Sequence, residues 1–196
     1  MKKYAMVFDA GTGAGRCNLF DMSGRLVSYA YREWEYLKDL SSSNKEAMLF
    51  DAEQFKKILF SLCRKVITQA GISADEIVAV SATSQREGMV WLDRFGKEIY
   101  AAPSVDLRGE EAADILSGKE PFIKEITGLP VSGMFGLARL LWYKKFNEAV
   151  YDRIDTVMMI SDWICYLLCG SKVSEPSVAS SSQLFDVKNG KWSSEL

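Results

Sequence analysis

The chain has 196 residues, of which 48% are hydrophobic and 26% are charged, and its net charge at pH 7 is -2. This size and composition predict a globular domain with a core of its own. The small net charge gives no support to a surface that binds nucleic acid or membrane, and the longest apolar stretch, residues 157–169, is too short to cross a bilayer. We therefore expect a cytoplasmic protein that binds neither nucleic acid nor membrane.

The sequence contains no histidine and four scattered cysteines. Without histidine, Ser-His-Asp and Cys-His catalysis are excluded, and acid–base chemistry falls to carboxylates. The cysteines do not have the spacing of a disulfide framework. Cys165 and Cys169 are four residues apart but lack further metal ligands, so we interpret them as small buried residues.

A glycine-rich loop joins two predicted strands, residues 3–9 and 16–21. Glycines at this density allow a tight turn and bring backbone N–H groups close to an anion. Asp9 precedes the loop, where a carboxylate can hold a divalent cation or its waters. No Gly-Lys-Ser/Thr follows, and the loop leads into a strand rather than a helix, so it is neither a P-loop nor a dinucleotide-binding loop. Taken alone, the loop is equally well explained as a plain glycine-rich turn.

The remaining elements predict an α/β domain that opens with a three-stranded antiparallel meander. Residues 26–34 complete the meander, and residues 51–70 form a helix that Asp51 caps and Gly71 ends. The dense apolar run 77–83 is typical of a strand buried on both faces. We expect the following further elements: strands at 89–92, 99–102 and 156–160, helices at 107–117, 137–150 and 162–169 (the last capped by Ser161 or Asp162), a loop-rich stretch at 118–136, and a strand at 183–187 before an Asn189–Gly190 turn.

Charged residues follow the dense apolar run. Arg86 and Glu87 lie at its carboxyl end, where the ligand sites of α/β proteins gather. A guanidinium beside a carboxylate offers donors and acceptors that suit the neighbouring hydroxyls of a polyol. A surface salt bridge between the two residues is the alternative. Asp106 is another candidate acceptor for a sugar hydroxyl, and its alternative role is to cap the helix that begins after it.

Several segments, in this order, resemble the amino-terminal domain of the FGGY carbohydrate kinases, which has the ribonuclease-H-like (actin-type ATPase) fold. The resemblance covers nearly the whole chain and rests on Asp9–Thr12 with Arg16, Ser84–Glu87, Val105–Arg108, Thr127–Pro130, Leu140–Trp142, Ser161–Trp163 and Leu184–Asp186. Within the family, residues 82–88 and 158–163 are most similar to autoinducer-2 kinases, with xylulokinases as the other subgroup.

The resemblance implies a kinase that transfers the γ-phosphoryl group of ATP to a hydroxyl of a small carbohydrate or carbohydrate-like signal. Its implied cofactors are ATP and Mg²⁺, because phosphoryl transfer needs the charge on the moving group to be neutralised. The implied site residues are Asp9 (for Mg²⁺, directly or through water), Gly11, Thr12, Gly13 and Arg16 for the phosphates, and Gln85, Arg86, Glu87 and Asp106 for the sugar.

The chain departs from the family pattern in three respects. It ends before the amino-terminal domain closes, so the expected general base lies beyond Leu196. The carboxy-terminal nucleotide-binding domain is absent. We therefore expect residues 1–196 to be one incomplete FGGY amino-terminal domain that is inactive without its missing partner domain. Met134 and Phe135 stand where glycerol kinases carry a tyrosine, and this favours a polyol other than glycerol.

Two other functions are consistent with the sequence. The first is a non-catalytic actin-fold module that binds a sugar or a nucleotide, for which binding without turnover would be diagnostic. The second is another ATPase of the same superfamily, such as an acetate-kinase-like or chaperone-like protein, and Arg86, Glu87 and the Asp162–Trp163 segment weigh against it. The sequence leaves open which sugar is bound and whether the protein is a homo-oligomer.

Overall fold

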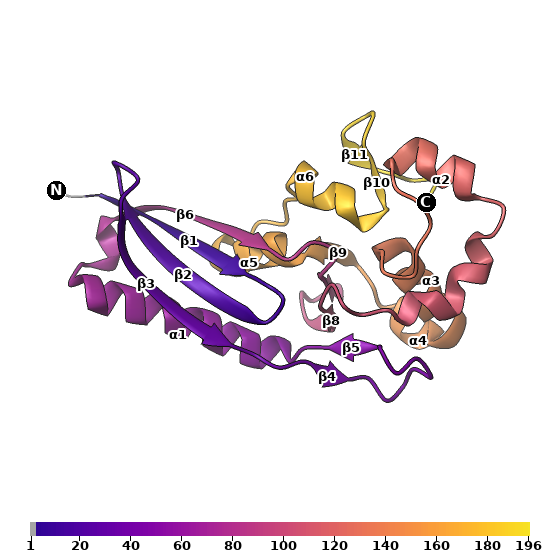
Figure 1. The fold of residues 1–196 in the computed structure, drawn as a ribbon, viewed down its shortest axis with the longest axis horizontal. Helices are drawn as coiled ribbons and strands as arrows, with labels where there is room; N and C mark the ends of the chain where they lie inside the picture. The colour runs from indigo at the N-terminus through magenta and orange to yellow at the C-terminus, as the bar shows by residue number, and fades with distance from the viewer. Residues whose placement is uncertain (1–2) are drawn as a thin grey trace.

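The first three strands form the predicted antiparallel meander in the computed structural model, which describes residues 3–196. β1 (Tyr4–Ala10) pairs with β2 (Ala14–Asp21), and β2 pairs with β3 (Leu26–Glu33). β6 (Ile77–Ser84) pairs in parallel with the other side of β1, so the sheet order is β3-β2-β1-β6. The loop after β1 and the carboxyl end of β6 therefore lie side by side at the same end of the strands (Figure 1).

One face of this sheet is covered by α1 (Ala52–Ala70), which runs along β2 and β3 (Figure 1). The Asp51 side chain accepts a hydrogen bond from Gln54 N at 3.0 Å, and Gly71 ends the helix with a left-handed φ of 63°. Apolar residues three or four apart give the helix a buried stripe made of Phe55, Ile58, Leu59, Leu62 and Val66. The predicted helix and both of its ends are confirmed.

A second, smaller sheet lies between two hydrophobic cores. Its strands, in spatial order, are β8 (Glu98–Ala102), β7 (Met89–Leu92) and β9 (Thr156–Met159). Because side chains alternate along a strand, β7 sends Val90 and Leu92 into the core of the first sheet, and Met89 and Trp91 into the second core. This strand therefore connects the two halves of the molecule through buried contacts on both faces.

Short elements complete the fold. They are β4 (Leu37–Lys38), β5 (Met48–Leu49), the 3₁₀ turns Ala74–Glu76 and Ser180–Ser182, the 3₁₀ helix Arg108–Leu116, α2 (Glu120–Thr127), α3 (Gly136–Phe146), α4 (Glu148–Tyr151), α5 (Ile160–Cys169), α6 (Pro176–Ala179), β10 (Phe185–Asp186) and β11 (Lys191–Trp192). α5 packs against β6, and α3 against the 3₁₀ helix. None of the helices in residues 3–196 is long and apolar enough to span a membrane.

The prediction that residues 77–83 are buried on both faces is wrong. Val78 and Val80 are 49% and 45% exposed. The apolar composition suggested a central strand of a parallel sheet, but within residues 3–196 β6 pairs with β1 alone and forms the edge of its sheet. Its apolar side chains therefore lie on an open surface.

Some predicted element boundaries are also wrong. The stretch 118–136 contains α2. The single helix predicted over 137–150 is divided at Asn147, whose φ of -150° ends α3 and whose side chain caps α4. Ser161 and Asp162 lie inside α5, which Met159 precedes as the cap.

The last strand and the cysteines differ from expectation as well. The strand predicted at 183–187 is shortened to β10, because Gln183 has a left-handed φ of 62°. All four cysteines are free; Cys165 is half-buried, and Cys169 is exposed, so neither is the fully buried residue that was predicted.

Candidate active site

The loop between β1 and β2 presents Thr12 and Gly13 to solvent. Gly11 N donates to Ala14 O at 2.9 Å and closes the turn. The loop glycines are not among the residues with positive φ, so this turn does not depend on left-handed backbone. Gly15 is required for a different reason: a Cβ at this position would lie 2.5 Å from the ring of Trp34.

Side chains packed under the loop hold its carbonyl groups inward. Trp34 Nε1 donates to Thr12 O at 3.1 Å, and the Tyr36 hydroxyl donates to the same oxygen. Gln85 Nε2 donates to Gly11 O at 3.4 Å. A trans peptide points its carbonyl and its N–H in opposite directions, so the N–H groups of Thr12 and Gly13 face away from these side chains. Neither N–H has a partner within residues 3–196, which leaves two adjacent donors for an anion.

Asp9 and Arg16 face each other across the two strands that flank the loop. Their side chains form an ion pair of 3.3 Å and are 36% and 51% exposed. The described residues contain no cluster of three or more candidate metal ligands. In phosphoryl-transfer sites Mg²⁺ is held by one or two carboxylates together with phosphates and waters. The exposed Asp9 carboxylate therefore fits a Mg²⁺ ion that the phosphates of a nucleotide help to hold.

Glu87, in the loop after β6, has a strained backbone that its neighbours hold in place. Its φ is 58°, which is uncommon for a residue other than glycine. Its carbonyl accepts a hydrogen bond from Arg139 Nη1 at 2.8 Å, and its N–H donates to Ser181 Oγ at 3.4 Å. Burial raises the pKa of the Glu87 carboxyl, against the opposing effect of Arg139 and Arg86.

The Arg86 side chain is exposed and makes no hydrogen bond or ion pair inside residues 3–196. The alternative salt bridge with Glu87 is therefore not formed in this structure. Glu87 itself lines a hollow of about 500 Å³. The other residues that line this hollow are Glu46, Met48, Ser104, Val105, Leu107 and Met134. Concave sites with mostly apolar walls and a few polar groups are typical of small-molecule binding.

Gln85 does not have a free amide for a ligand. Its Oε1 accepts hydrogen bonds from Ser104 N and Ser104 Oγ, each at 2.8 Å. Its Nε2 donates to the Tyr36 hydroxyl at 3.0 Å as well as to Gly11 O. The amide therefore lies between the phosphate loop and the hollow, and the geometry does not favour direct sugar contact by Gln85.

Asp106 is fully buried, and its carboxylate is already bonded on both oxygens. Oδ2 accepts from the Tyr100 hydroxyl at 2.6 Å and from Arg108 Nε at 2.7 Å, and Oδ1 accepts from Met48 N at 3.1 Å. Oδ1 also accepts from Arg108 N at 3.4 Å, but Leu107 is the cap of the helix that follows, so Asp106 does not have the alternative role of helix cap. The structure thus gives no support to its predicted contact with a sugar hydroxyl.

The structure adds positioning residues that the sequence did not reveal: Trp34, Tyr36, Ser104 and Arg139. Arg139 carried the clearest available signal, because a charged residue between Leu137 and Leu140 interrupts the apolar stripe of α3. It is fully buried and also donates to Ser104 O, at 3.1 Å.

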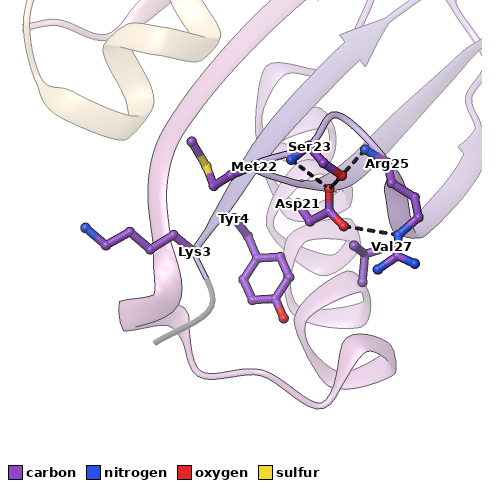
Figure 2. A pocket seen from close by; sticks show the side chains of 7 residues that line it. All are labelled: Lys3, Tyr4, Asp21, Met22, Ser23, Arg25 and Val27. Carbon is purple, nitrogen blue, oxygen red and sulfur yellow. Dashed lines mark hydrogen bonds and ion pairs between the residues drawn. The ribbon is translucent and has the colours of Figure 1, made fainter.

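A second hollow, of about 510 Å³, lies at the other end of the β2–β3 hairpin (Figure 2). The carboxylate in its lining is used within the turn: Asp21 accepts from Ser23 N and Oγ and from Arg25 N and Nε. The Ser23 hydroxyl and the Arg25 N–H lower the pKa of Asp21 to about 2. With its carboxylate already engaged, we assign no ligand to this hollow.

The chain is similar to known proteins along nearly its whole length. Residues 4–196 match the family model described as the FGGY family of carbohydrate kinases, N-terminal domain. The chain belongs to this family. FGGY relatives include an autoinducer-2 kinase from Salmonella paratyphi B, which is 33% identical over 98% of this chain, and one from Escherichia coli K12, which is 33% identical over 100% of this chain. The chain spans 37% of the length of each of these relatives.

Solved FGGY structures show the same fold at lower identity. A xyloylose kinase from Brucella ovis superposes with a TM-score of 0.87 over 97% of this chain and 38% of its own, at 21% identity. A glycerol kinase from Plasmodium falciparum, determined with ADP, has a TM-score of 0.83 over 99% of this chain and 40% of its own, at 20% identity. The predicted ribonuclease-H-like, actin-type fold is confirmed.

Proposed function

We propose that this chain forms the phosphate- and sugar-binding part of an ATP-dependent kinase. The enzyme transfers the γ-phosphoryl group of ATP to a hydroxyl of a small carbohydrate or carbohydrate-like signal. One observation carries the proposal: β1 and β6 are parallel, with Asp9 beside Thr83 and Ala10 beside Ser84. Since neighbouring parallel strands have their carboxyl ends on the same side of the sheet, ligands bound by the two following loops lie next to each other.

The first loop supplies the groups that phosphoryl transfer requires. The outward N–H groups of Thr12 and Gly13 bind phosphate oxygens. Asp9 holds Mg²⁺ or its waters, and the bound ion supplies neutralisation of phosphate charge. Arg16 is 51% exposed, forms an ion pair with Asp9 and lies over the Tyr31 ring; it turns to the phosphates and stabilises charge on the transferred group.

The second loop binds the sugar. Arg86 offers unused donors, and the Glu87 carboxylate lines the hollow as an acceptor. Transfer also needs a general base and an adenine site, and we assign neither to residues 1–196. We propose that both come from outside these residues, and that residues 1–196 by themselves do not phosphorylate a sugar.

The two relatives named above match along nearly the whole chain and are autoinducer-2 kinases, so we propose an autoinducer-2-type carbohydrate signal as the substrate. Met134, at the wall of the hollow, replaces the tyrosine expected for glycerol. We place the reaction in the cytoplasm.

The proposal is tested on the protein expressed from the complete reading frame that contains these residues. ADP release is followed with autoinducer-2, xylulose, gluconate and glycerol as acceptors. We expect ATP-dependent phosphorylation of autoinducer-2 above that of glycerol. Calorimetric binding of MgATP and sugar without any turnover would instead favour the non-catalytic module.

A further inference from the structure

We infer that Gln85 is a positioning residue that couples the phosphate loop to the sugar hollow, rather than a residue that contacts the sugar. The inference rests on the proposed function and deepens it. Gln85 lies directly after β6, and its backbone N–H donates to Ala10 O at 2.8 Å, which continues the ladder between the two parallel strands. Its side chain therefore starts from a fixed point between the two loops.

The orientation of the Gln85 amide is fixed by its partners. Ser104 N is an obligate donor, so the group that faces it at 2.8 Å must be the amide oxygen. Gly11 O is an obligate acceptor, so the group that faces it at 3.4 Å must be the amide nitrogen. A flipped amide would place like groups against each other at both ends.

On the phosphate side, the amide acts through a chain of hydrogen bonds. Gln85 Nε2 donates to the Tyr36 hydroxyl at 3.0 Å, and this hydroxyl uses its own proton to donate to Thr12 O. Gln85 thus holds Gly11 O directly and Thr12 O through Tyr36. Those two carbonyls determine where the N–H groups of Thr12 and Gly13 point, and these are the proposed phosphate donors.

On the sugar side, the amide holds a loop that forms the wall of the hollow. Ser104 lines the hollow, and both its N–H and its hydroxyl donate to Gln85 Oε1. The carbonyl of Ser104 is held in turn by Arg139, which also holds the carbonyl of Glu87. A displacement of the Gln85 side chain therefore moves the phosphate loop and the hollow together.

Three variants of the full-length protein separate the two ends of the amide. Gln85→Leu removes all four hydrogen bonds. Gln85→Glu keeps the acceptor for Ser104 but sets a carboxylate oxygen against Gly11 O. Tyr36→Phe removes the link to Thr12 O together with the acceptor for Gln85 Nε2 and Trp34 Nε1, and leaves both hydrogen bonds from Ser104 in place. The matched control is Gln69→Leu, an exposed glutamine whose side chain accepts a single hydrogen bond, from Ser28 Oγ at 3.3 Å.

The first readout is backbone hydrogen exchange, which needs no substrate. We expect Gln85→Leu to speed exchange about 10-fold at the hydrogen-bonded amides in residues 11–15 (Gly11) and in residues 103–106 (Ser104 and Asp106), because each segment loses hydrogen-bonded support. Gln85→Glu and Tyr36→Phe should affect residues 11–15 alone, and Gln69→Leu neither segment. Unchanged exchange at 103–106 in Gln85→Leu would overturn the inference.

The second readout is steady-state kinetics with ATP and autoinducer-2. We expect Gln85→Glu to raise the KM for ATP about 10-fold and leave the KM for the sugar within about 2-fold, since one end of the amide is retained. A rise confined to the KM for the sugar would mean that Gln85 contacts the sugar, and would refute the inference. A wild-type protein without kinase activity would refute the proposed function, while the exchange experiment would still decide the role of Gln85.

Discussion

Replacing Arg108 by methionine tests how far the second core depends on its buried ion pairs. The Arg108 side chain is fully buried and lies 2.7 Å from Asp106 Oδ2 and 2.7 Å from Asp39 Oδ2. It also donates to the Tyr143 hydroxyl at 2.8 Å. Burial by itself would lower the pKa of this guanidinium, but the surrounding Tyr100 and Asp106 raise it. The net pKa lies above its ordinary value, so the group stays charged.

The magnitude follows from what the substitution leaves behind. Methionine fills much of the space but leaves Asp106 fully buried, with Arg139 Nε no closer than 4.0 Å. An uncompensated buried charge of this kind costs about 3–5 kcal/mol. For a domain of this size each kcal/mol lowers the melting temperature by about 2–4 °C, so we expect a fall of about 6–20 °C.

Thermal unfolding followed by tryptophan fluorescence measures this effect, since Trp91 and Trp142 are buried in the same core. The matched control is Arg153→Met, because Arg153 is 54% exposed and lies 3.6 Å from Asp93. A surface ion pair contributes only about 0–1 kcal/mol. Equal melting temperatures for the Arg108 and Arg153 variants would refute the reasoning.

Two further predictions concern the loop and a buried carboxyl. Gly15→Ala should displace Trp34 and lower the free energy of unfolding by about 1–3 kcal/mol. Gly13→Ala should be tolerated, because nothing lies within 4 Å of the new Cβ. Melting curves of the two variants distinguish these outcomes. Burial raises the pKa of Asp162 to about 6, and its Oδ2 has no partner among the described residues. Between about pH 4 and 6 the folded protein therefore keeps a proton on Asp162 that the unfolded chain has already lost. The free energy of unfolding should fall as pH rises through this window, by about 3 kcal/mol at most. Asp162→Asn should abolish this fall in a series of denaturation midpoints against pH, and an unchanged slope would contradict the assignment.

The elements that could be predicted from sequence are those with strong local signals. The meander has apolar strands separated by turn residues, and α1 has a clear helical periodicity with the end signals Asp51 and Gly71, so the predictions of both are confirmed. β6 was misjudged because an apolar strand has the same composition in the centre of a sheet and at an edge. Its position depends on which strands pair with it, and that is a property of the tertiary structure.

In the candidate site, too, local sequence signals were predictable and tertiary contacts were not. The phosphate loop could be predicted from its glycines and flanking charges, because these residues are contiguous in sequence. The hydrogen bonds that shape it come from Trp34, Tyr36 and Gln85, which are distant from the loop in sequence and were assigned no such role. The burial of Asp106 could not be predicted, because nothing local indicates that Tyr100 and Arg108 engage its carboxylate.

The most direct test of phosphoryl transfer at this loop compares wild type with Asp9→Asn in the full-length protein, with ATP and autoinducer-2 as substrates. Asp9 is part of an exposed ion pair, so the substitution should change stability by only about 0–1 kcal/mol. Turnover should fall by about 10²–10³-fold or more, the cost of removing one electrostatic contact to the transition state. An Asp9→Asn protein that turns over at the wild-type rate would contradict the account.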